Sequence, residues 1–395
     1  MLRRVFLMPV MLLGVAIGCS QQKQVTQKEA AHQQWNAARA NVMLSLAKGQ
    51  YDTGNFDKSR QTVDEALKYD DTNAQLHILS AKLAIEQGQL EWAQKELDRA
   101  RGLDTHNAEA DYLCGVIYQR WQKPETAFEF YGSACEKAPA ELAYLMAKAE
   151  MLVAMDRAKE ALALLQAKVV YFEHSSAIRD AAGQLLQTQG RHVEAAEMFR
   201  QASILAPEDV TARERLGLSL YYGKQYADGA DVLGRLVKEE AYERRADVIL
   251  ALGECQMQTG KYREARSTFE TAVQVDPSMS QGWASLGKSA LQLKDYKRAE
   301  LSLKKALSLD PQSSEINLMI GFLRLRQDRF SDAMASFQQA NNLDRADTVS
   351  LCLIGYILEK SGRGDQAMGY YAQALRLKPN DELATKLMAG VDLHE

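Results

Sequence analysis

Along this chain, apolar residues recur among polar ones at the spacing of an α-helix. Between Ser280 and Pro311, apolar positions follow one another at steps of three or four residues in two separate runs. Such steps place the apolar side chains on one face of a helix. The small residues Gly287 and Ala299 let two helices pack closely, and Pro311 ends the second helix because its ring clashes with the carbonyl four residues back. This segment therefore predicts a pair of antiparallel helices.

The same pattern occurs ten times in register. The copies begin at Ala40, Ala74, Ala108, Leu142, Ser176, Val210, Ala246, Ser280, Ser314 and Thr348. Every step is 34 residues, except the 36-residue step from Val210 to Ala246. Counting from each start, position 8 is always Ala or Gly, position 24 is always large and apolar, and five of the seven prolines stand at position 32. One helical unit is therefore repeated over residues 40–381.

This pattern resembles the tetratricopeptide repeat, a helix–turn–helix unit of 34 residues. In the eighth copy, the residues that carry the resemblance are Trp283, Gly287, Ala299, Ala306 and Pro311. The resemblance implies an all-α fold, a right-handed superhelical solenoid of about ten units. Each unit buries its apolar face only against its neighbours, so such a chain grows in one dimension and not around a central core.

Two copies depart from the pattern. Position 27 is Ala in eight copies, but it is Lys168 in the fourth copy and Leu236 in the sixth. The sixth copy also contains two extra residues within 238–245. We expect these two copies to pack less tightly than the others.

Residues 1–18 have the pattern of a bacterial signal peptide. Two arginines precede a thirteen-residue apolar run over 5–17, which is too short to span a bilayer comfortably. The dipeptide Gly18-Cys19 resembles the cleavage motif of bacterial lipoproteins, which implies cleavage before Cys19 and a lipid on its sulfur. Ala16 stands where that motif prefers Leu. Because Ala-x-Gly also fits an ordinary signal peptidase, simple secretion stays open as an alternative.

The other segments outside the repeats are short. We expect a polar tether over 19–28, an N-terminal helical extension over 29–39 and a capping helix over 382–395. The apolar stripe of the last segment consists of Leu383, Leu387 and Val391. By resemblance to bacterial lipoproteins, Ser20 directly after the cysteine implies the outer membrane, with the protein facing the periplasm.

Charge and composition exclude several classes of function. Lys plus Arg number 48 and Asp plus Glu number 52, a net charge of −4, which argues against nucleic acid as the main partner. No histidines stand at metal-ligand spacing and no cysteines form a Cys-x-x-Cys pair. We expect no metal, cofactor, small-molecule substrate or catalytic residue, because ten repeats and a cap leave no room for a catalytic domain. A disulfide between Cys114 and Cys135 stays open.

The resemblance also indicates where a partner binds. In tetratricopeptide-repeat proteins, positions 5, 6, 9 and 12 of each first helix line the concave groove. The ninth and tenth copies place apolar residues there: Leu318, Met319, Phe322, Leu325, Leu353 and Tyr356. The fifth to seventh copies place polar and acidic residues there: Asp180, Gln184, Gln187, Glu214, Asp247 and Glu254. This groove predicts an amphipathic partner segment with a basic flank. Alternatively, neighbouring helices cover the apolar positions.

Two functional hypotheses follow. The first is a membrane-anchored, non-enzymatic scaffold or assembly factor of the bacterial cell envelope, which binds a protein partner in its groove. Its layout is similar to the repeat lipoproteins of pilus, outer-membrane assembly and polysaccharide export systems. The alternative is an accessory regulator of a cell-wall or exopolysaccharide enzyme, which binds the enzyme or its glycan. An aromatic groove would favour a glycan, and an aliphatic groove would favour a peptide helix.

Overall fold

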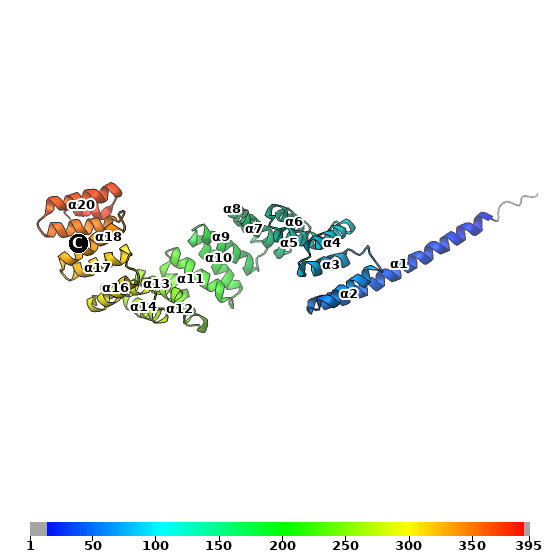
Figure 1. Cartoon of the computed structure of the whole chain (residues 1–395), viewed down its shortest axis with the longest axis horizontal. Coiled ribbons are helices and arrows are strands. Elements are labelled where there is room, and N and C mark those ends of the chain that lie inside the picture. Colours follow the sequence, from blue (N-terminus) through cyan, green and yellow to red (C-terminus); the bar gives the residue numbers. More distant parts are fainter. Residues whose placement is uncertain (1–13, 391–395) are drawn as a thin grey trace, which may run out of the picture. The chain divides into compact units, whose positions relative to one another are not determined.

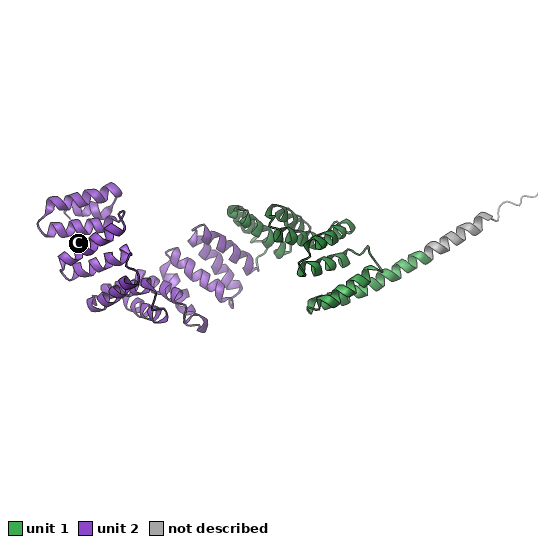
Figure 2. Cartoon of the chain, in the orientation of Figure 1, with its two compact units in different colours: residues 1–173 green, residues 174–395 purple. Residues whose placement is uncertain are grey.

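The protein is built from paired helices. The computed structural model describes residues 14–390, and the side chains of residues 28–390. Within this described part there are 21 α-helices, one short 3-10 helix and no strand (Figure 1). The prediction of an all-α repeat fold is therefore confirmed. The chain forms two compact units, Met1–Glu173 and His174–Glu395 (Figure 2).

The first unit contains four helix pairs. Its helices are α1 (Gly14–Asp52), α2 (Phe56–Leu67), α3 (Ala74–Glu86), α4 (Leu90–Leu103), α5 (Ala108–Arg120), α6 (Pro124–Lys137), α7 (Leu142–Ala154) and α8 (Ala158–Lys168). Each first helix packs against its own second helix, and α2, α4 and α6 each pack against the first helix of the next pair.

The second unit contains six helix pairs and a final single helix. Its helices are α9 (Ser176–Thr188), α10 (His192–Leu205), α11 (Val210–Tyr222), α12 (Tyr226–Leu236), α13 (Ala246–Gln258), α14 (Tyr262–Val275), α15 (Ser280–Gln292), α16 (Tyr296–Leu309), α17 (Ser314–Arg326), α18 (Phe330–Leu343), α19 (Thr348–Lys360), α20 (Gly364–Leu377) and α21 (Glu382–Met388). In every copy except the first, the first helix begins at the residue where the sequence places the start of the repeat.

The two helices of each repeat cross at positions 8 and 24. A Cβ added to Gly355 would lie 2.5 Å from Cε1 of Tyr371, and one added to Gly287 would lie 2.6 Å from Cγ of Leu303. Real Cβ atoms do not approach carbon so closely, so these crossings admit only glycine unless the neighbour moves. The side chain at position 24 therefore occupies the space that a Cβ would take.

The signature residues of the eighth repeat serve this packing. Ala299 and Ala306 on α16 are completely buried, and Leu303 lies between them in the same core cluster. The Trp283 indole N–H donates to the carbonyl of Pro277 at 3.0 Å. Pro311 is exposed in the turn after α16, where it cannot extend the helix.

The turn inside each repeat needs a left-handed residue. Position 15 has a positive φ in all ten copies: Gly54, Gly88, Gln122, Asp156, Gly190, Lys224, Gly260, Lys294, Asp328 and Gly362. Half of these residues are glycine, for which this conformation is unstrained. The other five side chains adopt a conformation that L-residues visit rarely. The period thus fixes backbone geometry as well as packing.

The fourth and sixth repeats have shortened second helices. α8 and α12 contain 11 residues, whereas α16 and six other second helices contain 14. Lys168 is exposed at the end of α8, while Leu236 is buried at the end of α12. A 3-10 turn over Glu240–Tyr242 follows α12 and holds part of the two-residue insertion. The boundary between the two units falls shortly after α8.

Both ends of the repeat array are helical. α21 packs against α19 and α20, and its Leu387 is 3% exposed. Asp381 is buried and is the N-cap residue of α21. Its carboxylate accepts a hydrogen bond from the Thr348 hydroxyl at 2.8 Å. The capping helix thus ends at Met388, and Val391 lies outside the described residues.

The N-terminal helix is longer than the sequence pattern predicts. α1 runs through the expected extension over 29–39 and also through 19–28, where we expected an irregular tether. A helix is possible there because Gln, Lys, Glu and Ala favour it and no Gly or Pro interrupts residues 19–48. Cys19 lies within this helix, and its side chain and residues 1–13 lie outside the description. Within the described part, no helix is long and apolar enough to cross a bilayer.

His77 is a buried polar link between α3 and α4 in the second repeat. Its Nδ1 lies 2.9 Å from Oε2 of Glu96, and its Nε2 lies 3.0 Å from the carbonyl oxygen of Asp71. Both ring nitrogens face acceptors, an arrangement that suits the doubly protonated imidazolium. Burial lowers the pKa of His77, but the hydrogen bonds to Glu96 and Asp71 outweigh it, so the pKa is raised.

We predict that Ala299→Leu overpacks the crossing and lowers the free energy of unfolding by roughly 1–3 kcal/mol. The matched control is Lys297→Leu on the same helix, because Lys297 is exposed and should change stability by less than about 0.5 kcal/mol. Thermal or chemical denaturation measures both values. Equal losses from the two changes would contradict the packing described here.

We predict that the stabilisation by His77 depends on pH. Because its pKa is raised on folding, the contribution is present below the ordinary value of 6.5 and is lost as the pH rises through the raised pKa. His77→Gln should therefore destabilise the protein more at about pH 6 than at about pH 9. The exposed His106→Gln serves as the control in the same melts. A loss that does not vary with pH would show that His77 is neutral in the folded state.

Candidate functional site

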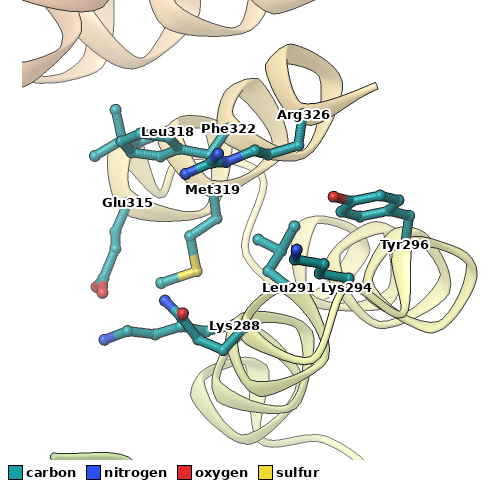
Figure 3. A pocket seen from close by; sticks show the side chains of 10 residues that line it. Lys288, Leu291, Lys294, Tyr296, Glu315, Leu318, Met319, Phe322 and Arg326 are labelled. Carbon is teal, nitrogen blue, oxygen red and sulfur yellow. The ribbon is translucent and has the colours of Figure 1, made fainter. Parts of the chain in front are cut away.

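A pocket of about 490 Å³ opens between the eighth and ninth repeats (Figure 3). It is formed by α15, the start of α16 and α17. Its lining residues are Lys288, Leu291, Gln292, Lys294, Tyr296, Glu315, Leu318, Met319, Phe322 and Arg326. All of them belong to the second unit, so the pocket lies within one compact body.

The floor of the pocket is apolar and is anchored in the core on two sides. Leu291 and Met319 are partly buried and pack against the core cluster shared by α15, α16 and α17. Leu318 and Phe322 are partly buried and pack against the C-terminal cluster. The Phe322 ring meets Phe337 edge to face at 5.7 Å between centroids. Both clusters therefore help to hold the floor in place.

Three of the six predicted groove residues line this pocket. Leu318, Met319 and Phe322 come from α17 and project into it, as Figure 3 shows. Leu325 is partly buried against the C-terminal cluster and is not part of the lining.

The prediction that Leu353 and Tyr356 face the groove is wrong. These residues are only 1% and 5% exposed, and they share the C-terminal core cluster with Leu387 of the capping helix. The packing of α21 against α19 explains this burial. At these two positions the alternative holds, in which neighbouring helices cover the apolar side chains.

Charged side chains surround the apolar floor. Lys288 projects from α15, Lys294 lies in the turn before α16, and Arg326 ends α17. Glu315 is the one acidic residue in the lining. Among the described residues, none of these four forms an ion pair or a side-chain hydrogen bond. The sequence pattern gave no signal for Lys294 and Arg326, which lie outside the positions expected to line a groove, whereas Lys288 stands at one of them, position 9.

The acidic stretch in the fifth to seventh repeats is largely engaged within the chain. Asp180 accepts from Arg215 at 2.6 Å, and Glu214 accepts from Arg245 at 2.6 Å. Arg245 also donates to both carboxylate oxygens of Asp247 at 2.9 Å, and this hydrogen bonding lowers the pKa of Asp247.

The remaining carboxylate of this stretch, Glu254, accepts a hydrogen bond from the hydroxyl of Ser285 at 2.5 Å. All four carboxylates therefore already have partners in the chain. The surface is less available to a basic partner than the sequence pattern predicts.

The described residues bring together no metal-binding cluster. No group of three or more His, Cys, Asp or Glu side chains could hold a metal ion among them. Cys114 and Cys135 are both free. Burial raises the pKa values of the Cys114, Cys255 and Cys352 thiols to about 12, so these side chains act as small apolar residues and not as nucleophiles.

Comparison with known proteins identifies the repeat. Family models of the tetratricopeptide repeat match residues 51–117 and 181–247, and a model of the C-terminal domain of cilia and flagella-associated protein 70 matches residues 224–394. None of these three is a catalytic family. No curated protein sequence matches the chain.

Solved structures with similar helices include MamA and two TPR proteins. MamA is 16% identical, with 42% of this chain and 95% of that chain covered and a TM-score of 0.38. A thermophilic TPR protein of Thermus thermophilus, TTC0263, is 22% identical. The match covers 46% of this chain and 97% of TTC0263, with a TM-score of 0.40. YrrB, a TPR protein with an unusual peptide-binding site, is 18% identical. The match covers 49% of this chain and 99% of YrrB, with a TM-score of 0.38.

The helix pairs, the crossing at positions 8 and 24 and the matching repeat models agree with one another. They support a protein-interaction scaffold and indicate no catalytic family. The chain contains tetratricopeptide repeats.

Proposed function

We propose that this protein is a non-enzymatic scaffold that binds a segment of a partner protein in the pocket between α15 and α17. The observation that carries the proposal is an apolar floor, formed by Leu291, Leu318, Met319 and Phe322, whose side chains are only partly buried and line one pocket. Accessible apolar pockets on soluble domains commonly serve as interaction sites.

The lining favours a protein segment over a glycan. Leu291, Leu318 and Met319 outnumber the two aromatic residues of the lining, Tyr296 and Phe322, and their aliphatic or thioether side chains complement the apolar face of a helix. The flexible thioether of Met319 also adapts to differently shaped side chains. A glycan-binding role as an enzyme regulator is therefore not adopted.

We further propose that the scaffold acts in the bacterial cell envelope, anchored through a lipid on Cys19 and facing the periplasm from the outer membrane. The support lies in the sequence: the two arginines, the short apolar run and the Gly18-Cys19 dipeptide. Diacylation or triacylation would hold the protein stably, because two lipid chains suffice for lasting attachment.

We predict that a photo-crosslinking residue in place of Met319 captures a discrete protein partner in the cells that produce the chain. The matched control is the same residue in place of Leu301, which is 71% exposed on α16 but lies outside the pocket. Both sites present an accessible apolar position, so only specific binding distinguishes them. Equal yields of crosslinked products from the two sites, or no product from Met319, would overturn the proposed binding site.

We predict that a fatty-acid probe fed to the cells labels the wild-type protein, whereas the Cys19→Ser variant stays unlabelled. The variant should also move from the membrane fraction to the soluble fraction, because the lipid is its proposed attachment. Labelling of both proteins, or of neither, would contradict the anchor. The pocket experiment does not depend on this result.

A further inference from the structure

We infer that the segment bound between α15 and α17 is acidic: an amphipathic segment whose apolar side chains are flanked by Asp or Glu. This inference rests on the proposed function and adds the chemistry of the partner. It reverses the basic flank predicted from the sequence, and it follows from which charges in this unit are paired and which are not.

The first step is the charge around the pocket. The lining contains three cations, Lys288, Lys294 and Arg326, and one anion, Glu315, so the rim carries a net charge of 3 − 1 = +2. The whole chain, by contrast, has a net charge of −4. A positive rim in a negative protein is a local feature, and it attracts acidic groups.

The second step is that these cations are free to bind. Several arginines elsewhere in the same unit have carboxylate partners: Arg215 pairs with Asp180, Arg245 with Glu214 and Arg329 with Asp332. Lys288, Lys294 and Arg326 have none among the described residues. An acidic partner would supply the missing carboxylates, whereas a basic partner would bring like charges together, which is unfavourable.

The third step is the position of the cations relative to the floor. Leu318, Phe322 and Arg326 follow one another at four-residue steps, so they lie along one face of α17. Figure 3 shows the Arg326 side chain beside this apolar row, and Met319 extending from α17 towards Lys288 on α15. A segment whose apolar side chains contact the floor would place its flanking residues beside these cations.

The fourth step concerns the carboxylates that suggested a basic partner. Asp180, Glu214 and Asp247 are held by arginines of the chain, and Glu254 accepts from Ser285. Binding a basic segment there would require these existing contacts to be exchanged. An acidic segment at the positive rim of the pocket would displace no existing contact. The rim is therefore a more favourable binding place than the acidic stretch.

The experiment uses three synthetic peptides of about eighteen residues, long enough for five helical turns. The first carries Leu along one face with Glu on both flanks, the second has Lys in place of Glu, and the third keeps Glu but has Ser in place of Leu. Fluorescence anisotropy with the purified full chain measures each dissociation constant. The Glu peptide should bind at least about tenfold more tightly than either other peptide, and its affinity should fall as salt rises.

Charge reversal in the pocket tests the residues. Lys288→Glu combined with Arg326→Glu should weaken binding of the Glu peptide and strengthen binding of the Lys peptide. The control, Lys297→Glu combined with Lys305→Glu, changes the net charge equally at exposed positions of α16 outside the pocket and should leave both affinities unchanged. Circular dichroism checks that both double variants stay folded.

Several results would overturn the inference: equal affinity for the Glu and Lys peptides, tighter binding of the Lys peptide, no binding of any peptide, or an equal effect of the two double variants. Tight binding of the Ser peptide would also overturn it, because the site would then be a general anion site such as one for an acidic lipid or glycan. If Met319 still crosslinks a partner in these cases, the proposed function survives and only the acidic chemistry is wrong. If Met319 crosslinks nothing, the proposed function itself fails.

Discussion

The structure depends on one close contact, the crossing of position 8 of each first helix with position 24 of the second. The sizes of the two residues compensate. Every aromatic residue at position 24, such as Tyr371, lies opposite glycine, here Gly355. Where position 8 is alanine, as at Ala81, the partner is a smaller aliphatic residue, here Leu97. This compensation lets units of different composition keep similar geometry and stack in register.

The turn at position 15 is a second constraint, because its left-handed backbone limits which residues can stand there without strain. All ten turns use a left-handed residue, yet only half of them are glycine. The others accept local backbone strain, which tertiary packing holds in place. Lys294 is one of them, and it is also a cation of the pocket rim. Its backbone position follows from the repeat, whereas its charge is free to serve binding.

The fold could be read from the sequence because packing repeats with the period. Lys168 and Leu236 stand in the two repeats whose second helices are short, although the sequence led us to expect looser packing there and not shorter helices. The site could be read only in part. Leu318, Met319 and Phe322 line the pocket, but the burial of Leu353 and Tyr356 depends on α21, which packs against them from outside the repeat pattern. Position in a repeat indicates the face of a helix and does not indicate what covers it.

Charge pairing is the feature of the structure that the 34-residue repeat period could not predict. Asp180 and Arg215 stand 35 residues apart, one repeat plus one position, so adjacent helices bring them together. The sequence contains many such candidate pairs, and only side-chain geometry decides which of them form. The four carboxylates at the groove positions of the fifth to seventh repeats have partners within the chain, whereas the cations of the rim between α15 and α17 have none among the described residues. Binding is favoured where a repeat protein leaves its apolar and charged side chains unmatched, because a partner there displaces no existing contact.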